Sequence, residues 1–427
     1  MIVFGIIAGT CLVVLCAFLF WMMLRIFVGF VTKYVASGCM VQLRSMEDLL
    51  ERDLWYLPVS WISFSKENHG IYGRLRGTTI SRYAGKNGSF GVTLYQSTKV
   101  QQAWKDEFSI FRLGGSPHCF EISENETISS LCQSYMDHHR SHAILVWQSG
   151  KMISETYAQG LSVKDTLPGW SMSKSVTNAM VGIATLKDGF DIHQPISTWV
   201  RGEFGDLTTH ELLQMKSNIP WGENYFFYSD VTKMLYVEED MQKFLTSKKV
   251  QSKGKKIWKY SSGDTNLIHC VLRAALGSKR YHELPFRDLF GPLGMDSARF
   301  ETDATGLYVG SSYVYATARD WLRFGVLYAQ NGMWMDKEIL TPAWVDYSKT
   351  VCPESKGEYG AHFWCNQGRK MPDVPQSCYS AEGFMGQRVF VLPSHHAVVV
   401  RLGASKKDAF DFNGLLSSVL SRLEEKP

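Results

Sequence analysis

The sequence has little net charge. Lysine and arginine total 45 against 41 aspartates and glutamates among 427 residues, which gives a formal charge of +4. A nucleic-acid-binding protein normally carries a concentrated basic face, so this balance gives no reason to expect a nucleic-acid partner. The lysine-rich stretch 248–256 is most simply a solvated loop, and the alternative is a membrane-surface role.

The cysteines lack the spacing of a metal site. None of the nine lies in a CxxC pair, and the seven outside the apolar N-terminus are odd in number. This pattern indicates neither a zinc site nor a complete disulfide framework. Cys365 and Cys378 flank a short polar loop and could pair across a hairpin or remain free thiols. Five histidines show no ligand spacing beside carboxylates: His193, His210, His269, His395 and His396.

The N-terminus is a long apolar run. Residues 1–24 are almost wholly apolar, and about 20 such residues cross the hydrocarbon core of a bilayer. No lysine or arginine precedes the run and no small-residue cleavage site follows it promptly, so it lacks the marks of a cleaved signal peptide. We predict a single-pass transmembrane anchor over residues 1–31. Arg25, Lys33 and Arg44 follow the span, and by the positive-inside rule they favour a cytoplasmic catalytic part.

The rest of the chain has globular proportions, with 45% hydrophobic and 20% charged residues overall. We assign 32–127 to a connector and a β-rich N-terminal region, with 101–117 as a linker. Alternation and turn residues predict strands over 61–65, 71–84, 90–95, 143–147, 152–158, 388–394 and 397–403. Helical periodicity predicts helices over 171–188, 264–275, 321–330 and 413–425, and Thr208, Asp264 and Thr317 are expected to cap helices. Strands at both ends with helices between them indicate one mixed sheet, which the chain leaves and later rejoins.

The motif that points to chemistry is Ser171-Met172-Ser173-Lys174, an S-x-x-K sequence. On a helix, residues i and i+3 share a face, so the lysine amine can reach the serine hydroxyl. Burial lowers the pKa of a lysine, and the neutral amine can then activate the serine as a nucleophile. Two other copies lie at 63–66, in a strand pattern, and at 252–255, in the lysine-rich loop. Only the copy at Ser171 follows a Pro-Gly-Trp turn and opens an apolar helix.

Two further segments follow in order: Tyr260-Ser261-Ser262-Gly263-Asp264 before a helix, and Gly383-Phe384-Met385-Gly386-Gln387 before a strand. With these three motifs, residues from about 128 to 425 resemble the β-lactamase-related serine hydrolases. That family includes class C β-lactamases, D-alanyl-D-alanine peptidases, family VIII esterases and nylon-oligomer hydrolases. The resemblance implies an α/β fold of the β-lactamase/transpeptidase type over 128–427. Such a fold is an antiparallel sheet flanked by helices, with an all-α insert at about 192–256 and a cleft between the two.

The resemblance also implies roles for individual residues. Ser171 would be the acylated nucleophile, and Lys174 the general base, alone or together with Tyr260, which would relay a proton to the leaving group. Backbone N–H groups of Ser171 and Gln387 would form the oxyanion hole, with Gly386 beside it. Trp170, next to the nucleophile, either lines the acyl pocket or simply packs. No metal or organic cofactor is required.

Two residues depart from the family pattern. Ser262 replaces the Asn of Y-x-N, which shortens one hydrogen-bonding arm. Phe384 stands where β-lactamases and peptidases carry a Lys or His that pairs with the substrate's carboxylate. An anionic substrate would lose water in the cleft without gaining a partner, unless Arg388 or Arg401 supplied the charge.

We therefore predict a membrane-anchored serine hydrolase that cleaves a small or oligomeric ester or amide through a Ser171 acyl-enzyme. One alternative is a cell-wall D-Ala-D-Ala peptidase or β-lactamase. The other is a catalytically degenerate, anchored binding protein, for which Ser262 and Phe384 are the motive. Because members of the resembled family mostly act outside the cytoplasm, we expect a periplasmic catalytic domain despite the flanking charges.

Overall fold

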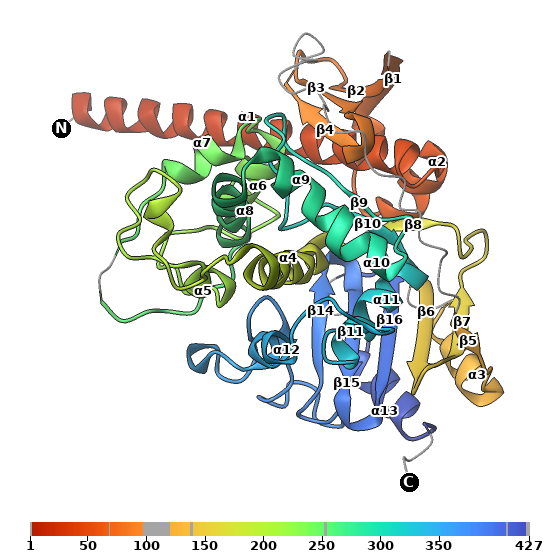
Figure 1. Ribbon diagram of the computed structural model, residues 1–427. Coiled ribbons are helices and arrows are strands. Elements are labelled where there is room, and N and C mark those ends of the chain that lie inside the picture. Colours follow the sequence, from red (N-terminus) through yellow and green to blue (C-terminus); the bar gives the residue numbers. More distant parts are fainter. Residues whose placement is uncertain are drawn as a thin grey trace.

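The computed structural model of the protein describes residues 2–67, 69–96, 120–136, 140–251, 254–406 and 409–423. Its main body is a seven-stranded sheet in the order β13-β14-β15-β16-β6-β7-β5, flanked by helices (Figure 1). All neighbouring strands are antiparallel except β5 and β7. The strands are β5 Glu121–Ile122, β6 Ser141–Gln148, β7 Lys151–Tyr157, β13 Trp364–Cys365, β14 Tyr379–Gly383, β15 Gln387–Leu392 and β16 Ala397–Gly403.

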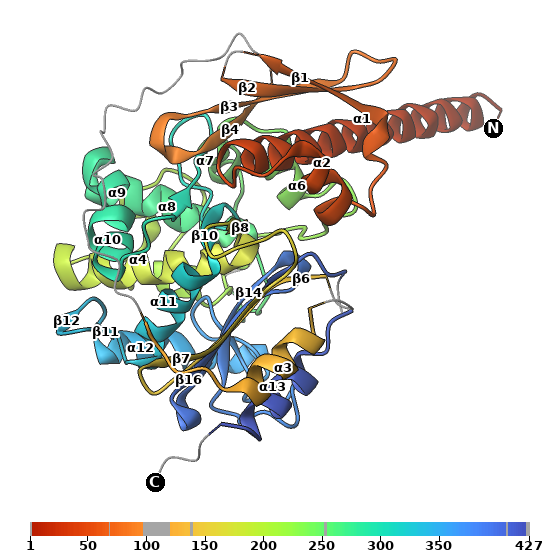
Figure 2. The same ribbon diagram turned by 90° about the vertical axis from the view of Figure 1, so that its right-hand side faces the viewer.

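The central strands are buried on both faces because successive side chains point to opposite sides of the sheet. Leu145 and Val400 pack in one core with α4 and α11, whereas Val146 and Val399 pack in a second core with α3 and α13 (Figure 2). The helices around the sheet are α3 Glu126–Ser134, α4 Ser173–Asp188, α8 Ser262–Leu276, α9 Ser278–Leu284, α10 Gly291–Leu293, α11 Ala318–Ala329, α12 Pro342–Lys349 and α13 Phe412–Leu420.

The region predicted as an all-α insert is helical. It holds α5 Thr209–Leu213, α6 Asp230–Tyr236 and α7 Met241–Thr246, and its described residues form only isolated β-bridges. Thr208 caps α5 in a capping box and Thr317 caps α11, as predicted. The prediction for Asp264 is wrong: Ser261 caps α8 by accepting from the Asp264 N–H, and the Asp264 side chain is buried.

Three smaller sheets complete the fold. The β-rich N-terminal region is a four-stranded antiparallel sheet of β1 Ile62–Glu67, β2 Gly70–Leu75, β3 Ser81–Lys86 and β4 Val92–Tyr95. The strands predicted at 61–65 and 90–95 are confirmed, whereas the single strand predicted over 71–84 is two strands, β2 and β3, that pair across a turn at 76–80. The others are β8 Thr166–Pro168 with β10 Val314–Thr317 and β9 Arg299–Phe300, and the pair β11 Met333–Trp334 and β12 Lys337–Glu338. The predicted linker 101–117 lies outside the described residues.

The N-terminal helix α1 covers Ile2–Met40 and so continues past residue 31, where we predicted the anchor to end. Its Gly9–Met40 portion is long and apolar enough to cross a membrane. Residues 9–21 are exposed and project beyond the body of the molecule, whereas from Met22 onward most side chains are buried (Figures 1 and 2). The second half of α1 lies between the β1–β4 sheet and α6. Half of this helix is therefore part of the folded domain.

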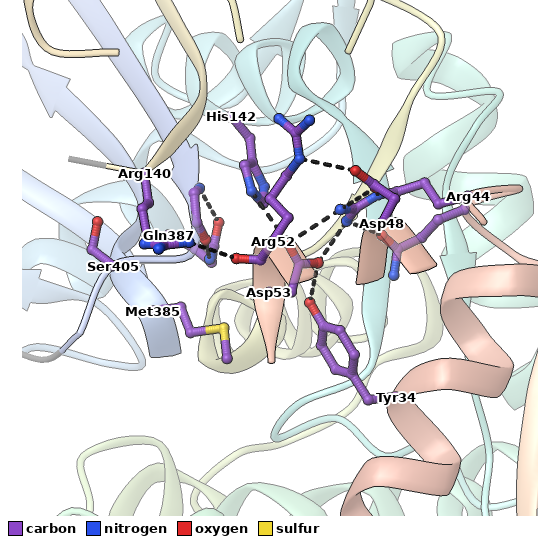
Figure 3. A network of polar contacts seen from close by, with 12 residues as sticks. Tyr34, Arg44, Asp48, Arg52, Asp53, Arg140, His142, Met385, Gln387 and Ser405 are labelled. Atoms are coloured by element: carbon purple, nitrogen blue, oxygen red, sulfur yellow. Dashed lines mark hydrogen bonds and ion pairs between the residues drawn. The ribbon is translucent and has the colours of Figure 1, made fainter. Parts of the chain in front are cut away.

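Close packing and buried ion pairs hold the second half of α1 in place. A Cβ at Gly29 would lie 2.7 Å from the carbonyl oxygen of Tyr236 in α6, so only glycine allows this approach. Lys33 forms a buried ion pair with Glu301. Figure 3 shows a second network, in which Asp53 accepts from Tyr34 of α1 at 2.7 Å and from Arg44 at 2.6 Å.

The Asp53 network yields a stability prediction. We expect Asp53→Ala to lower the free energy of unfolding by ~3–5 kcal/mol, because it leaves Arg44 buried without its main carboxylate partner. Glu121→Ala, which breaks the exposed Lys151–Glu121 pair, should cost less than ~1 kcal/mol. Denaturant titration of the full chain in detergent measures both values. Equal losses in the two variants would contradict the role given to Asp53.

Candidate active site

The predicted nucleophile lies just before a helix. Ser171 is in a 3₁₀ turn, Trp170–Met172, that leads directly into α4, so the α-helix begins two residues later than predicted. Trp170 has a φ of 49°, a left-handed conformation that bulky residues rarely adopt. Such strain persists only where the surrounding structure imposes it, and it is concentrated at functional sites.

Lys174 reaches the nucleophile as the motif predicts. Its side chain is almost fully buried, and its Nζ lies 3.1 Å from Ser171 Oγ. The same Nζ lies 3.1 Å from Ser262 Oγ and 3.0 Å from the carbonyl oxygen of Ser311. Burial lowers the pKa of Lys174 to about 8, although the nearby negative charge of Glu223 raises it. At a pKa of about 8, roughly a tenth of the lysine is neutral at pH 7, far more than at its usual pKa.

Ser262 is supported by a carboxylate that sequence reasoning missed. Its Oγ donates to Glu223 at 2.5 Å, and its backbone N–H donates to the same carboxylate at 2.9 Å. Glu223 also accepts from the Trp221 indole N–H at 2.5 Å and from the Tyr225 hydroxyl at 3.0 Å. Ser262 thus contacts Lys174 directly and is held in place by Glu223. Although its side chain is shorter than that of the family's Asn, it still forms the hydrogen bond to Lys174.

Tyr260 completes the group around Ser171. It precedes α8, its ring stacks on Trp364 with centroids 5.4 Å apart, and Lys174 Nζ lies 4.8 Å from the ring centroid. Burial and the charge of Glu223 raise the pKa of Tyr260 well above its usual value, and a hydrogen bond to Ser171 opposes that rise. The Tyr260 phenol therefore keeps its proton at the pH values at which Lys174 loses one. Opposite pKa shifts in neighbouring groups separate an acid from a base.

The end of β14 meets the nucleophile turn. A Cβ on Gly383 would lie 2.2 Å from the carbonyl oxygen of Gly169, so the two segments touch. Gly383, Phe384 and Gly386 line the cavity beside Ser171. Gln387 is buried, and its side-chain oxygen accepts from the Gly403 N–H at 3.0 Å. The role predicted for Gln387 concerns its backbone N–H and stays a prediction.

Aromatic rings surround Ser171. The Phe384 ring stacks on Tyr225, with centroids 6.2 Å apart, and meets Trp170 edge-on at 5.7 Å. Phe384 therefore lies in the site and not in the core. Of the two candidate cations, Arg388 lines the cavity but pairs with Glu382 at 3.0 Å. Arg401 is fully buried and donates to the backbone carbonyls of residues 385 and 386.

The cavity that holds these residues has a volume of about 800 Å³. We predicted a cleft between the sheet and the all-α insert, and both contribute, through Phe384 and Tyr225. A third wall was not predicted: Met23, Ile26, Phe27 and Phe30 of α1 also line the cavity.

Comparison with known proteins agrees with this geometry. The sequence model of the Beta-lactamase family matches residues 128–421. The chain belongs to the beta-lactamase family. A 6-aminohexanoate-dimer hydrolase of Paenarthrobacter ureafaciens is 24% identical over 307 residues, covering 65% of this chain and 76% of the relative. The resemblance inferred from the three motifs is thereby confirmed, and the protein is a β-lactamase-related serine hydrolase.

Solved structures share the fold of this beta-lactamase family member. A protein of Bacillus anthracis assigned as a 6-aminohexanoate-dimer hydrolase superposes with a TM-score of 0.61 at 18% identity, covering 71% of this chain and 87% of that one. A class C β-lactamase gives a TM-score of 0.53 at 13% identity, covering 71% and 97%. These values confirm the predicted fold class.

The other predicted features fall outside the site. The S-x-x-K copy at 63–66 lies on β1, where Ser63 donates to the Arg74 carbonyl oxygen. Ser252 and Lys253 of the third copy lie outside the described residues. Cys365 and Cys378 are both free thiols, so the hairpin disulfide that we left open is absent.

Proposed function

We propose that this protein is a membrane-anchored hydrolase that cleaves an ester or amide through an acyl-enzyme on Ser171. The observation that carries the proposal is the set of contacts around Lys174 Nζ. A neutral amine has two hydrogens and one lone pair. Ser262 Oγ and the Ser311 carbonyl oxygen can accept the two hydrogens, which leaves the lone pair for the Ser171 hydroxyl at 3.1 Å.

In the acylation step, Ser171 Oγ forms a bond to the substrate's carbonyl carbon while its proton moves to Lys174 Nζ. The bond from that carbon to the leaving oxygen or nitrogen then breaks, and the leaving group takes a proton from Tyr260, which recovers one from Lys174. Water attacks the acyl-enzyme with the same groups and releases a carboxylic acid. This sequence gives Lys174 the role of base and Tyr260 that of acid, in line with their opposite pKa shifts.

The tetrahedral intermediate needs two donors for its oxyanion. We propose that the backbone N–H of Ser171 supplies one, and that the backbone N–H of Phe384 or the predicted one of Gln387 supplies the other. Phe384 lines the cavity at the end of β14, where that strand touches the nucleophile turn. The Phe384 and Trp170 rings then flank the acyl group.

We propose that α1 anchors the domain on the periplasmic side of the membrane. Lys33 and Arg44 are buried in ion pairs with Glu301 and Asp53, so neither is a free flanking charge in the folded protein. The flanking charges still favour a cytoplasmic domain at insertion, and the proposal follows the resembled family, whose members mostly act outside the cytoplasm. A reporter fused after Pro427 should be active outside the cytoplasm, and activity confined to the cytoplasm would contradict this placement.

A neutral substrate suits the aromatic wall better than an anionic one. Phe384 offers no charge, and Arg388 is paired with Glu382. The 6-aminohexanoate-dimer hydrolase relative supports an amide or ester substrate. We expect hydrolysis of neutral p-nitrophenyl esters, with nitrocefin a poor substrate. Efficient nitrocefin turnover or labelling by a fluorescent penicillin would favour the peptidase or β-lactamase alternative.

The proposed base predicts the pH dependence. Lys174 must be neutral to accept a proton, so kcat/KM should rise with pH to a plateau, with the midpoint of the rise at about 8. Glu223→Gln removes the charge that raises the pKa of Lys174, and should therefore move the midpoint of the rise to lower pH. Glu382→Gln, a cavity carboxylate that is not among the causes of this shift, serves as the control. A midpoint that is the same in all three proteins would exclude Lys174 as the titrating base.

A further inference from the structure

The helix that carries the exposed apolar stretch also builds the catalytic cavity. Met23, Ile26, Phe27 and Phe30 line the cavity, and their i, i+3, i+4, i+7 spacing places them on one face of α1. They begin two residues after Trp21, the last residue of the exposed stretch 9–21. The exposed apolar stretch and this wall of the cavity are thus consecutive segments of one helix.

The length of α1 and the residues Trp21 and Arg25 indicate where along the helix a bilayer would end. Residues 2–21 are 20 helical residues and span about 30 Å, the thickness of a hydrocarbon core. The Arg25 guanidinium lies 4.6 Å from the Trp21 ring centroid. Tryptophan and basic residues mark membrane–water interfaces. The cavity therefore begins where the bilayer ends.

A loop of the all-α insert lies at the same level. The Tyr228 ring contacts Phe18 of the exposed stretch, with centroids 6.4 Å apart. The two residues before it, Phe226 and Phe227, line the cavity and yet are 72% and 60% exposed. Neighbouring exposed apolar side chains of this size mark an interaction surface. In this position the adjoining surface is the bilayer that surrounds Phe18.

Apolar contacts continue from this level to the nucleophile. The Phe30 ring lies 6.1 Å from Trp170, the residue before Ser171. From the loop, Tyr225 stacks on Phe384, which meets Trp170 edge-on. The apolar wall therefore starts at the bilayer and ends beside the atom that would hold the acyl group.

We infer that the substrate is a long-chain acyl ester or amide resident in the bilayer. Its hydrocarbon chain passes between α1 and the loop at 225–228, and its carbonyl carbon reaches Ser171 Oγ. The cavity of about 800 Å³ is within the ~300–1,000 Å³ range of small-molecule sites. This inference rests on the proposed hydrolase function and names the substrate class of the same site.

The test uses the full chain in phosphatidylcholine vesicles, with p-nitrophenyl butyrate and p-nitrophenyl palmitate as probes. Wild type should prefer the palmitate at least ~10-fold in kcat/KM. Two variants should each lower this palmitate-to-butyrate ratio at least ~10-fold: the double variant Phe226→Ser with Phe227→Ser, and Phe27→Trp, which narrows the cavity. Leu15→Ala, on the exposed stretch of the same helix, should leave the ratio within ~2-fold.

A second experiment tests whether the substrate's acyl chain enters the cavity from the bilayer or from solution. Palmitate ester placed in the enzyme's own vesicles should be cleaved faster than the same ester bound to serum albumin in solution, and equal rates would overturn entry from the bilayer. A wild-type preference for butyrate, or ratios unchanged in both cavity variants while butyrate is still cleaved, would overturn the substrate class alone. If neither ester is cleaved and a fluorophosphonate does not label the protein, the proposed hydrolase function itself fails.

Discussion

Replacement of Ser171 by alanine should lower kcat/KM for p-nitrophenyl esters by at least ~10³-fold. Among the described serines, Ser171 is the one that lines the cavity and also has its hydroxyl within hydrogen-bond distance of Lys174 Nζ. The neighbouring Ser173 hydroxyl accepts from the Val314 backbone N–H inside the core. Fold and membrane association should persist, since Ser171 lies on the cavity wall. Initial rates at saturating and limiting ester concentrations measure the loss.

The other two S-x-x-K copies are the matched controls. Ser63→Ala alters a strand residue of the β1–β4 sheet, and Ser252→Ala alters the lysine-rich loop. Both variants should retain wild-type activity within ~2-fold. Near wild-type activity in Ser171→Ala, or a large loss in either control, would contradict the assignment of the nucleophile.

Lys174→Ala and Tyr260→Phe should each lower kcat by at least ~10²-fold, the usual contribution of a positioned acid or base. The lysine variant removes the lone pair that faces Ser171 Oγ. The tyrosine variant keeps the stacked ring on Trp364 and removes only the hydroxyl. Steady-state kinetics and thermal unfolding should be measured on the same preparations.

The two variants differ in what they test. Tyr260→Phe retains its packing, so an unchanged melting temperature with a large loss of kcat would locate the effect in proton transfer. Lys174→Ala removes a hydrogen-bond donor from Ser262 Oγ and from the Ser311 carbonyl oxygen, and Lys174→Met limits the change in packing. Full activity in both Lys174 variants would exclude the lysine as base.

Local sequence patterns predicted the parts of this fold that depend on neighbours along the chain. The strands at either end of the N-terminal sheet, the capping box at Thr208 and the Ser171–Lys174 pair were all anticipated. Each is set by turn residues, alternation or the repeat of a helix, which act over a few positions. The expected places of Tyr260 and Phe384 came instead from the resemblance of their motifs to those of the family.

Contacts between distant segments escaped the sequence analysis. In the sequence, Lys33 is a basic residue that follows the apolar span, as expected at the end of an anchor. In the structure it forms an ion pair with Glu301, which lies 268 residues away in sequence. This buried pair lets α1 continue into the domain and form a wall of the cavity. Glu223 lies in the all-α insert and carries no motif, yet it positions Ser262. The end of β14 brings Phe384 to the cavity.

The acyl-enzyme is the central claim, and fluorophosphonate labelling of the full chain followed by tandem mass spectrometry tests it most directly. Trypsin should release residues 165–174, a peptide with two serines, Ser171 and Ser173. The account predicts a phosphonyl adduct on Ser171 and no labelling of Ser171→Ala. An adduct on Ser173, equal labelling of Ser171→Ala, or an unlabelled wild-type protein would contradict it, and the last result would favour a catalytically degenerate binding protein.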